Sequence, residues 1–308
     1  MELIGDVNLS VNRTMPSGIV LNPNNHDIVF LSYDEPNADI NYQHLLSIKP
    51  KAMRVDGVKG SDAAHKACAE LAKTERVIII DGDNHVLPNL WHHNVYTKTG
   101  FDWSNYVFSW SSFNVVNNTS YGNGGVKCWP VQLIKEMRTH EVGTGVDFDL
   151  TNYLELNAIG SHTVINGSAK QAFRAGFRDG VKLSLIKDDW RTDNRLYNWL
   201  HVGSDVEFGL WAIYGARLGR FMLNRNLDVV ILNDFDKLND LFNKYYGIAS
   251  TNLLHECNKL GDLLDIGPVL SVEESIKFKQ NYKAPIRSPE LFMGGDRQDA
   301  INKFNERI

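Results

Sequence analysis

The segment ERVIIIDGDN, residues 75–84, runs from an apolar stretch directly into two carboxylates that are one residue apart. Asp81 and Asp83 can both place oxygen atoms on one divalent cation if a turn after the apolar stretch re-aims their side chains. Mg²⁺ and Mn²⁺ prefer such hard oxygen ligands, and Mg²⁺ usually completes its shell with water and substrate phosphates. The spacing therefore predicts a Mg²⁺ or Mn²⁺ site at Asp81 and Asp83 that also takes a diphosphate.

Two other interpretations of DGDN stay open. An Asp-Gly pair favours a type I′ hairpin turn and Asn84 adds turn propensity, so a plain turn explains the pattern equally well. A phosphatase of the haloacid dehalogenase type also follows an apolar run with DxD, and there Asp81 would be the nucleophile. That motif commonly has Thr or Val where this chain has His85, and it normally opens its domain. An EF-hand loop is excluded, because Val86 stands where that loop needs glycine.

The elements before the acidic motif alternate between strand and helix patterns. In chain order they are a strand at 27–35, a helix at 41–48, a strand at 52–58, a helix at 61–74 and a strand at 76–81. This order with short connections predicts a parallel sheet covered by helices. Ligands bind in such sheets outside the carboxyl ends of the strands, where Tyr33-Asp34-Glu35 and Asp81-Gly82-Asp83 both fall. We therefore expect the two acidic segments to face one cleft.

The rest of the chain predicts an extension of the sheet and then helices. Aromatic and β-branched runs between about 103 and 166 indicate mixed or antiparallel strands, and helical patterns follow. The expected fold is α/β, a mixed, mainly parallel sheet flanked by helices, with a helical C-terminal part. The expected divisions are a lead-in at 1–26, a main domain at 27–245 with halves at about 27–130 and 131–245, and a helical extension at 246–308.

Composition limits the class of protein. A chain of 308 residues suffices for one large domain or two modest ones. The net charge of -5 confines any nucleic-acid site to one region. Three widely spaced cysteines predict neither a disulfide framework nor a zinc site. With no signal-peptide pattern and no apolar run near the roughly 20 residues that span a bilayer, we expect a soluble, cytoplasmic protein without a membrane partner.

The segment VDGVKGSDAAHKACAELAKTERVIIIDGDN, residues 55–84, resembles the donor-binding half of nucleotide-sugar glycosyltransferases with the GT-A fold. The match covers spacing as well as residue type: a Gly-containing turn, an Ala-rich helix and an apolar strand ending in DxD. The resemblance implies a Rossmann-like GT-A fold, a nucleotide-sugar donor such as a UDP-sugar, and Mn²⁺ or Mg²⁺ as cofactor. It implies that Asp83 is the direct metal ligand bridging to the diphosphate and that Asp81 lies near the donor ribose and the metal.

The same resemblance implies further donor contacts from the first strand and from the turn and helix before DxD. These are Ser32, Tyr33, Asp34, Gly60, His65 and Lys66. Lys66 would be a phosphate partner. Judged from the residues alone, His65 and Lys66 form one exposed face of an amphipathic helix.

A second motif, SDVEFGL at 204–210 followed by GARLG at 215–219, looks like the GT-A acceptor-side signature. There an acidic pair precedes a helix that ends in a small-residue turn, and in inverting members the second acid is the general base. Asp205 occupies that position. The chain departs from the pattern at Ser204, where many families carry Glu. The residues alone predict that Ser204 caps a helix, with Glu207 completing a capping box.

Two further features are acceptor candidates. Gly124 and Gly125 would let the backbone approach a sugar closely, or they form a flexible hairpin tip. A basic stripe forms on a helix when charges recur every fourth residue, as they do at Lys170, Arg174, Arg178 and Lys182. Such a stripe, with Arg174 and Arg178 at its centre, binds a phosphate backbone or is a solvated helix face.

Together the motifs across 27–245 resemble GT-A-like proteins of tailed bacteriophages that decorate hydroxymethylcytosine in DNA with sugars, including arabinose. The resemblance implies a metal-dependent DNA arabinosyltransferase in the host cytoplasm, with modified DNA as acceptor. Trp110 would then stack on a displaced base, or it is an ordinary core residue. A glycosyltransferase acting on a glycan or protein would use the same donor residues.

Overall fold

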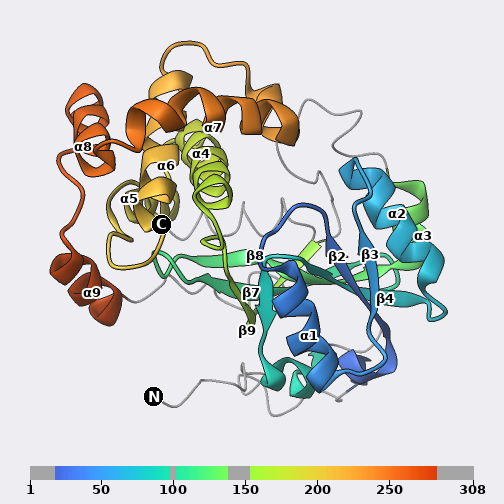
Figure 1. Cartoon of the computed structure of the whole chain (residues 1–308). Coiled ribbons are helices and arrows are strands. Elements are labelled where there is room, and N and C mark those ends of the chain that lie inside the picture. The colour runs from blue at the N-terminus through green and yellow to red at the C-terminus, as the bar shows by residue number, and fades with distance from the viewer. Residues whose placement is uncertain (1–17, 98–101, 138–152, 283–308) are drawn as a thin grey trace. The chain divides into compact units, whose positions relative to one another are not determined.

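A computed structural model gives the fold and describes residues 18–97, 102–137 and 153–282 (Figure 1). These residues fall into two compact units. The described part of unit 1 comprises 18–113 and 121–163 with the gaps just given, and that of unit 2 comprises 114–120 and 164–282. The main boundary follows Thr163, later than the division at about 130 expected from the sequence. The expected C-terminal extension belongs, as far as residue 282, to unit 2.

Unit 1 contains the strands and the first helices. Its strands are β1 Gly18–Leu21, β2 Asp27–Ser32, β3 Met53–Asp56, β4 Arg76–Asp81, β5 Asn84–Val86, β6 Val95–Thr97, β7 Val107–Asn114, β8 Ser120–Pro130 and β9 Tyr153–Thr163. Its helices are α1 Ala38–Ile48, α2 Ser61–Leu71 and α3 Val131–Glu136, with 3-10 turns η2 Pro23–Asn25 and η3 Pro88–His92. The tip of the β7–β8 hairpin, residues 114–120, is assigned to unit 2.

The predicted alternation of strands and helices is confirmed as β2, α1, β3, α2 and β4. β2 pairs in parallel with both β3 and β4. Right-handed crossovers then require α1 and α2 on opposite faces of the sheet, and Figure 1 shows them there. Alternate residues of β4 enter different cores: Ile78 and Ile80 pack in the cluster that includes α1, and Val77 and Ile79 in the cluster that includes α2 and α3.

The main sheet has the strand order β3-β2-β4-β8-β7-β9-β5 within the described residues. Parallel pairing joins β3, β2 and β4, whereas β4–β8 and β5–β9 are antiparallel. The sheet is therefore mixed, as predicted, but it is not mainly parallel. The reason is connectivity: β7 and β8 follow each other through a short turn, without the helical crossover that parallel neighbours need. A separate two-stranded sheet joins β1 and β6.

The DGDN turn connects β4 to a strand with which it does not pair. β2 and β8 occupy the two edges of β4, so β5 pairs with β9 at the end of the strand order. A type I′ hairpin needs a positive φ at both central residues, and neither Gly82 nor Asp83 has one. Gly82 and Asp83 do form a turn, as that alternative expected, but it is not a type I′ hairpin. The sheet curls so that β5 can continue directly from β4.

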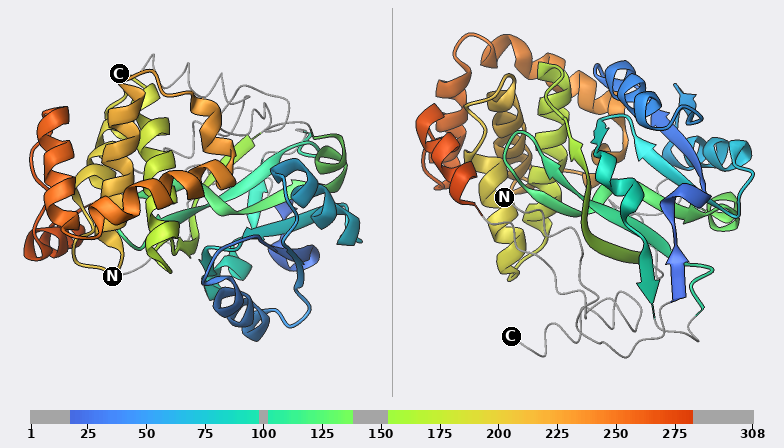
Figure 2. Two further views of the ribbon diagram at one scale, coloured as in Figure 1. Left: turned by 45° about the horizontal axis from the view of Figure 1, so that its top comes forward. Right: turned by 90° about the horizontal axis from the view of Figure 1, so that it is seen from below.

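Unit 2 is built mainly from helices. They are α4 Ala169–Leu185, α5 Trp190–His201, α6 Gly209–Leu223, α7 Phe235–Ala249, α8 Leu253–Leu264 and α9 Val272–Asn281, with the 3-10 turn η4 Val229–Asn233. α4 and α6 run side by side (Figure 2). Glycine permits this approach, because a Cβ at Gly176 would lie 1.9 Å from the Ala212 carbonyl oxygen and one at Gly215 would lie 2.3 Å from that of Phe173.

The start of α6 differs from the sequence prediction. α6 begins at Gly209, after Phe208 in a left-handed conformation, so Ser204 is not its N-cap and the predicted capping box is wrong. Ser204 instead donates a 2.7 Å hydrogen bond to the Leu270 carbonyl oxygen. GARLG lies inside α6 and does not form a turn at its end, because Gly215 is needed at the α4 contact. None of the helices in the described ranges combines the length and apolar character needed to cross a membrane.

Candidate metal and nucleotide site

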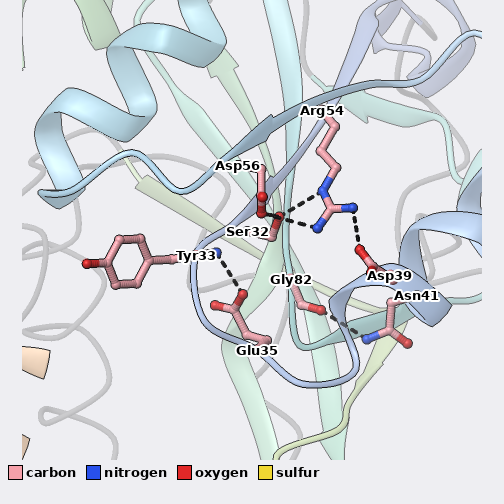
Figure 3. Close-up of polar contacts among 8 residues, drawn as sticks. All are labelled: Ser32, Tyr33, Glu35, Asp39, Asn41, Arg54, Asp56 and Gly82. Atoms are coloured by element: carbon pink, nitrogen blue, oxygen red, sulfur yellow. Dashed lines mark hydrogen bonds and ion pairs between the residues drawn. The ribbon is translucent and has the colours of Figure 1, made fainter. Parts of the chain in front are cut away.

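The acidic segments after β2 and β4 come together, as predicted. Asp81 ends β4, Asp83 lies in the following turn, and Glu35 follows β2. A Cβ at Gly82 would lie 2.6 Å from Glu35 Oε2, so the Glu35 carboxylate packs against the turn between the two aspartates. Glu35 Oε2 is fixed there by a 2.8 Å hydrogen bond from the Tyr33 backbone N–H (Figure 3). Glycine in DGDN is thus needed for close approach of a third carboxylate.

Mutual repulsion among these carboxylates acts on Asp83. Burial, followed by the charges of Asp81 and Glu35, raises the pKa of Asp83 to about 7. Asn84 Nδ2 donates a 2.6 Å hydrogen bond to Asp83 Oδ1, which lowers that pKa without offsetting the rise. A positive charge among the three carboxylates would favour their ionised forms. The site therefore has the electrostatics of one that a cation stabilises.

The carboxylate oxygens at this site suit a cation that completes its coordination shell with atoms of the substrate. Within the described ranges, no three His, Cys, Asp or Glu side chains are arranged to hold a metal ion by themselves. Mg²⁺, however, is commonly bound by one or two carboxylates together with waters and substrate phosphates. Asp81 and Asp83 fit such an incomplete shell, and Glu35 is a further candidate.

Lys127 brings a positive charge to the same end of the sheet. It lies on β8, next to β4, and its side chain is 9% exposed. Its Nζ donates a 2.7 Å hydrogen bond to the Gly124 carbonyl oxygen and lies 4.0 Å from Asp81 Oδ2. An anionic diphosphate beside Asp81 would meet this ammonium group. Lys127 is therefore a candidate phosphate partner in addition to Lys66, the one that the sequence indicated.

His65 is not on an exposed helix face. Its ring is buried on α2, with Nδ1 2.8 Å from the Ser61 carbonyl oxygen, and burial lowers its pKa. The exposed-face interpretation is therefore wrong for His65, whereas Lys66 is partly exposed on the same helix. Gly60 precedes α2 with a φ of 94°, which explains glycine there.

A second polar cluster lies at the carboxyl ends of β2 and β3 (Figure 3). Arg54 Nη1 lies 2.6 Å from Asp39 Oδ1, and Arg54 Nη2 lies 3.1 Å from Asp56 Oδ1. Ser32 is buried, accepts from Arg54 Nε at 2.9 Å and donates to Asp56 Oδ1. Ser32 therefore orients Asp56, and its buried hydroxyl group is engaged by Arg54 and Asp56 instead of by a nucleotide sugar. The side chain of Asp56 is 57% exposed and can accept a hydrogen bond from a ligand hydroxyl.

Tyr33 and Asp34 are the predicted donor residues of the first strand that reach solvent. Both are exposed, and the Tyr33 ring points away from the Arg54 cluster (Figure 3). An exposed aromatic ring at the end of a central strand offers a face on which a nucleoside base can stack.

Three predicted acceptor residues serve the fold of unit 1. Trp110 is fully buried in the core that includes α1, so it cannot stack on a displaced base. Gly124 and Gly125 lie inside β8 and not at a hairpin tip. A Cβ at Gly124 would lie 2.4 Å from the Trp110 carbonyl oxygen, and one at Gly125 would lie 2.0 Å from Asn84 Nδ2. The space beside the paired glycines is therefore filled by the Trp110 backbone and the Asn84 side chain, where the sequence predicted a sugar.

The basic stripe of α4 is covered where Arg174 and Arg178 lie. Arg174 is buried and donates a 3.1 Å hydrogen bond to Asn239 Oδ1 of α7. The guanidinium carbons of Arg174 and Arg178 lie 5.0 and 5.5 Å from the centre of the Phe235 ring. Because α7 packs on this part of α4, Arg174 and Arg178 form neither a solvated helix face nor an open phosphate-binding stripe.

Asp205 belongs to unit 2 and forms an ion pair. Its Oδ2 lies 2.5 Å from Lys279 Nζ, and the two side chains are 9% and 12% exposed. Lys279 also donates a 3.1 Å hydrogen bond to the Val116 carbonyl oxygen. In this arrangement Asp205 holds α9 in place, and action as a general base would require Lys279 to leave it.

Several residues of the site were missed from the sequence. They are Arg54, Asp56, Asn84 and Lys127. Asn84 stands in the DGDN segment itself, but its partners depend on strand order. Arg54 and Asp56 end a short edge strand, a place where polar residues are unremarkable in a sequence.

Comparison of the chain with protein-family models, with curated proteins and with solved structures yields no match.

Proposed function

We propose that this chain is a metal-dependent glycosyltransferase that binds a nucleotide-sugar donor at the carboxyl ends of β2 and β4. The proposal rests on the convergence of Glu35, Asp81 and Asp83, where burial and then the charges of Asp81 and Glu35 raise the pKa of Asp83 to about 7. A cation bound with a diphosphate would relieve that repulsion. The GT-A resemblance of residues 55–84 supplies the reaction class.

We assign the nucleotide part of the donor to residues of unit 1. A bound Mg²⁺ or Mn²⁺ ion supplies charge that stabilises the departing nucleoside diphosphate. Lys127, 4.0 Å from Asp81, adds a fixed positive charge for the phosphates. Tyr33 offers its exposed ring to the base, and Asp56, oriented by Ser32 and Arg54, accepts a hydrogen bond from a ribose hydroxyl.

The acceptor is a hydroxyl group. The phage resemblance favours hydroxymethylcytosine in DNA, with arabinose as the transferred sugar, and a glycan or protein is the alternative acceptor. Trp110 and Arg174 give this choice no support, because both are buried. Since Asp205 is paired with Lys279, the proposal rests on the donor site alone.

The donor claim is tested by measuring release of nucleoside diphosphate from a panel of nucleotide sugars with Mn²⁺. Wild-type protein should release it with at least one sugar, and EDTA or Asp83→Asn should abolish release. Asp102→Asn is the matched control, because it removes one carboxylate from an exposed part of unit 1. Release of inorganic phosphate through a phosphoaspartate on Asp81, with no response to nucleotide sugars, would identify a phosphatase and overturn the proposal.

The acceptor is tested separately with radiolabelled donor sugars. Label should appear on duplex DNA containing hydroxymethylcytosine and not on the same duplex with plain cytosine. Label on both duplexes or on neither, together with transfer to a glycan or protein, would exclude DNA and leave the donor claim intact.

A further inference from the structure

Asn84 is tied to Asp83 on one side and to a chain of buried hydroxyl groups on the other. Its side chain is 1% exposed. Nδ2 donates to Asp83 Oδ1 at 2.6 Å, and Oδ1 accepts from Ser161 Oγ at 2.7 Å. Behind it, Thr163 Oγ1 lies 2.7 Å from Ser112 Oγ, and Ser112 Oγ lies 2.9 Å from the Ser161 carbonyl oxygen.

The buried hydroxyl groups bond to one another as well as to Asn84. Ser112 Oγ donates to the Ser161 carbonyl oxygen, and a proton is shared between Ser112 Oγ and Thr163 Oγ1. Ser161 Oγ lies 2.7 Å from Asn84 Oδ1 and 3.2 Å from Ser112 Oγ, so the contact to Asn84 is the shorter of the two. With its oxygen engaged by Ser161, the amide presents Nδ2 to Asp83 Oδ1. Strands β7 and β9 thereby set the orientation of Asn84.

The backbone of β8 leaves the room for this amide. A Cβ at Gly125 would lie 2.0 Å from Nδ2, 2.5 Å from Cγ and 2.9 Å from Oδ1 of Asn84. All three of these nearest atoms belong to Asn84, so an alanine at position 125 would displace that side chain specifically. Gly125, the last glycine of YGNGGVK, is therefore part of the support for Asp83.

We infer that Asn84 is the positioning residue of the cation site, and that the Ser112–Ser161–Thr163 hydroxyls and the bare Gly125 hold its amide against Asp83. The inference rests on the proposed function, because Asp83 is taken as a ligand of the cation. The hydrogen bond fixes the orientation of the carboxylate that would hold the metal. Groups that orient metal ligands in this way typically change metal affinity by about 10- to 100-fold when removed.

The test is the dissociation constant for Mn²⁺, measured by electron paramagnetic resonance with UDP present. Asn84→Ala should weaken Mn²⁺ binding by about tenfold or more. Gly125→Ala should do the same in the wild-type background and add little to Asn84→Ala, because its Cβ would then meet no amide. Ser161→Ala is a milder variant that should weaken binding by a few-fold, on the order of a hydrogen bond. The matched control is Ser109→Ala, since Ser109 Oγ is buried on β7 and has no hydrogen-bond partner among the described residues.

A merely structural role is distinguished by melting temperatures measured without metal. If Asn84→Ala and Gly125→Ala lower the melting temperature but keep the wild-type Mn²⁺ dissociation constant, the inference is wrong. Additive effects of Asn84→Ala and Gly125→Ala on Mn²⁺ binding would also overturn it. Asp83→Asn separates the two proposals: wild-type affinity in that variant overturns the cation site itself, whereas loss there with no change in Asn84→Ala overturns only the role of Asn84.

Discussion

At the scale of single residues, the site depends on how closely like charges are held. Gly82 lets Glu35 approach the turn, and burial together with the charges of Asp81 and Glu35 raises the pKa of Asp83 to about 7. Repulsion that the fold imposes and a ligand relieves is a common feature of functional sites. It also makes stability depend on pH in a direction opposite to that of a salt-bridged carboxylate.

Asp83 should lower the stability of the metal-free protein as pH rises. Its pKa is about 7 in the folded protein and about 4 in the unfolded chain, so between these values the folded state binds more protons. Stability is then lost as pH increases through this window. Asp83→Asn should remove this loss and be more stable than wild type at pH 8 by on the order of 1 kcal/mol. Urea denaturation at pH 5 and pH 8 measures it, and an equal pH dependence in both proteins would contradict it.

Gly82→Ala should displace Glu35 without unfolding the chain. The new Cβ would lie 2.6 Å from Glu35 Oε2, which is the end of a flexible side chain and can move. With Glu35 displaced, less repulsion acts on Asp83, so the pKa of Asp83 should fall. The check is NMR titration of the Asp83 carboxyl carbon. An unchanged pKa in Gly82→Ala would show that Glu35 does not contribute.

At the scale of elements, close backbone contacts and one ion pair order unit 2. Glycines let α4 and α6 touch through their backbones, and the Asp205–Lys279 pair joins α9 to the segment before α6. These contacts explain why GARLG and SDVEFG stand out in the sequence. Both stretches are accounted for by packing, whatever further role Asp205 has.

Gly176→Ala should destabilise the protein strongly. Its Cβ would lie 1.9 Å from the backbone oxygen of Ala212, so the helices must separate, at a cost of about 2–3 kcal/mol as for other overpacked sites. Gly247→Ala is the matched control on α7, where a Cβ meets nothing within 4 Å. It should stabilise the protein by up to about 1 kcal/mol through helix propensity. Equal denaturation midpoints for Gly176→Ala and wild type would refute the close contact.

Lys279→Met should leave the largely buried Asp205 carboxylate without its partner. Breaking such a pair from one side costs about 3 kcal/mol, and Asp205→Asn in the same chain should recover part of it. Lys277→Met, on the exposed side of α9, is the control and should have little effect. Chemical denaturation of wild type, Lys279→Met, Asp205→Asn and the double variant gives the coupling energy between the two side chains. A double variant as unstable as the sum of the single changes would show that the pair does not act as a unit.

At the scale of the whole molecule, local patterns were readable and long-range partners were not. The order from β2 to β4 followed from hydrophobic runs and turn signals, and it placed Glu35 and Asp83 at the same edge correctly. Strand order beyond β4 depends on tertiary pairing, so the contacts of Gly125 with Asn84 and of Lys127 with Asp81 could not be derived. Trp110 is an ordinary core residue, the second of the two interpretations, and nothing in its local sequence could decide between them.

Calorimetric titration of UDP into the protein shows whether unit 1 holds a cation-dependent nucleotide site. Binding should require Mn²⁺, be lost with EDTA, and weaken at least about tenfold in Asp83→Asn while staying unchanged in Asp102→Asn. UDP is the probe here because the GT-A resemblance implies it as the nucleotide. Equal UDP affinity with and without Mn²⁺, or an Asp83→Asn variant that binds like wild type, would show that Asp83 does not hold a cation for the nucleotide.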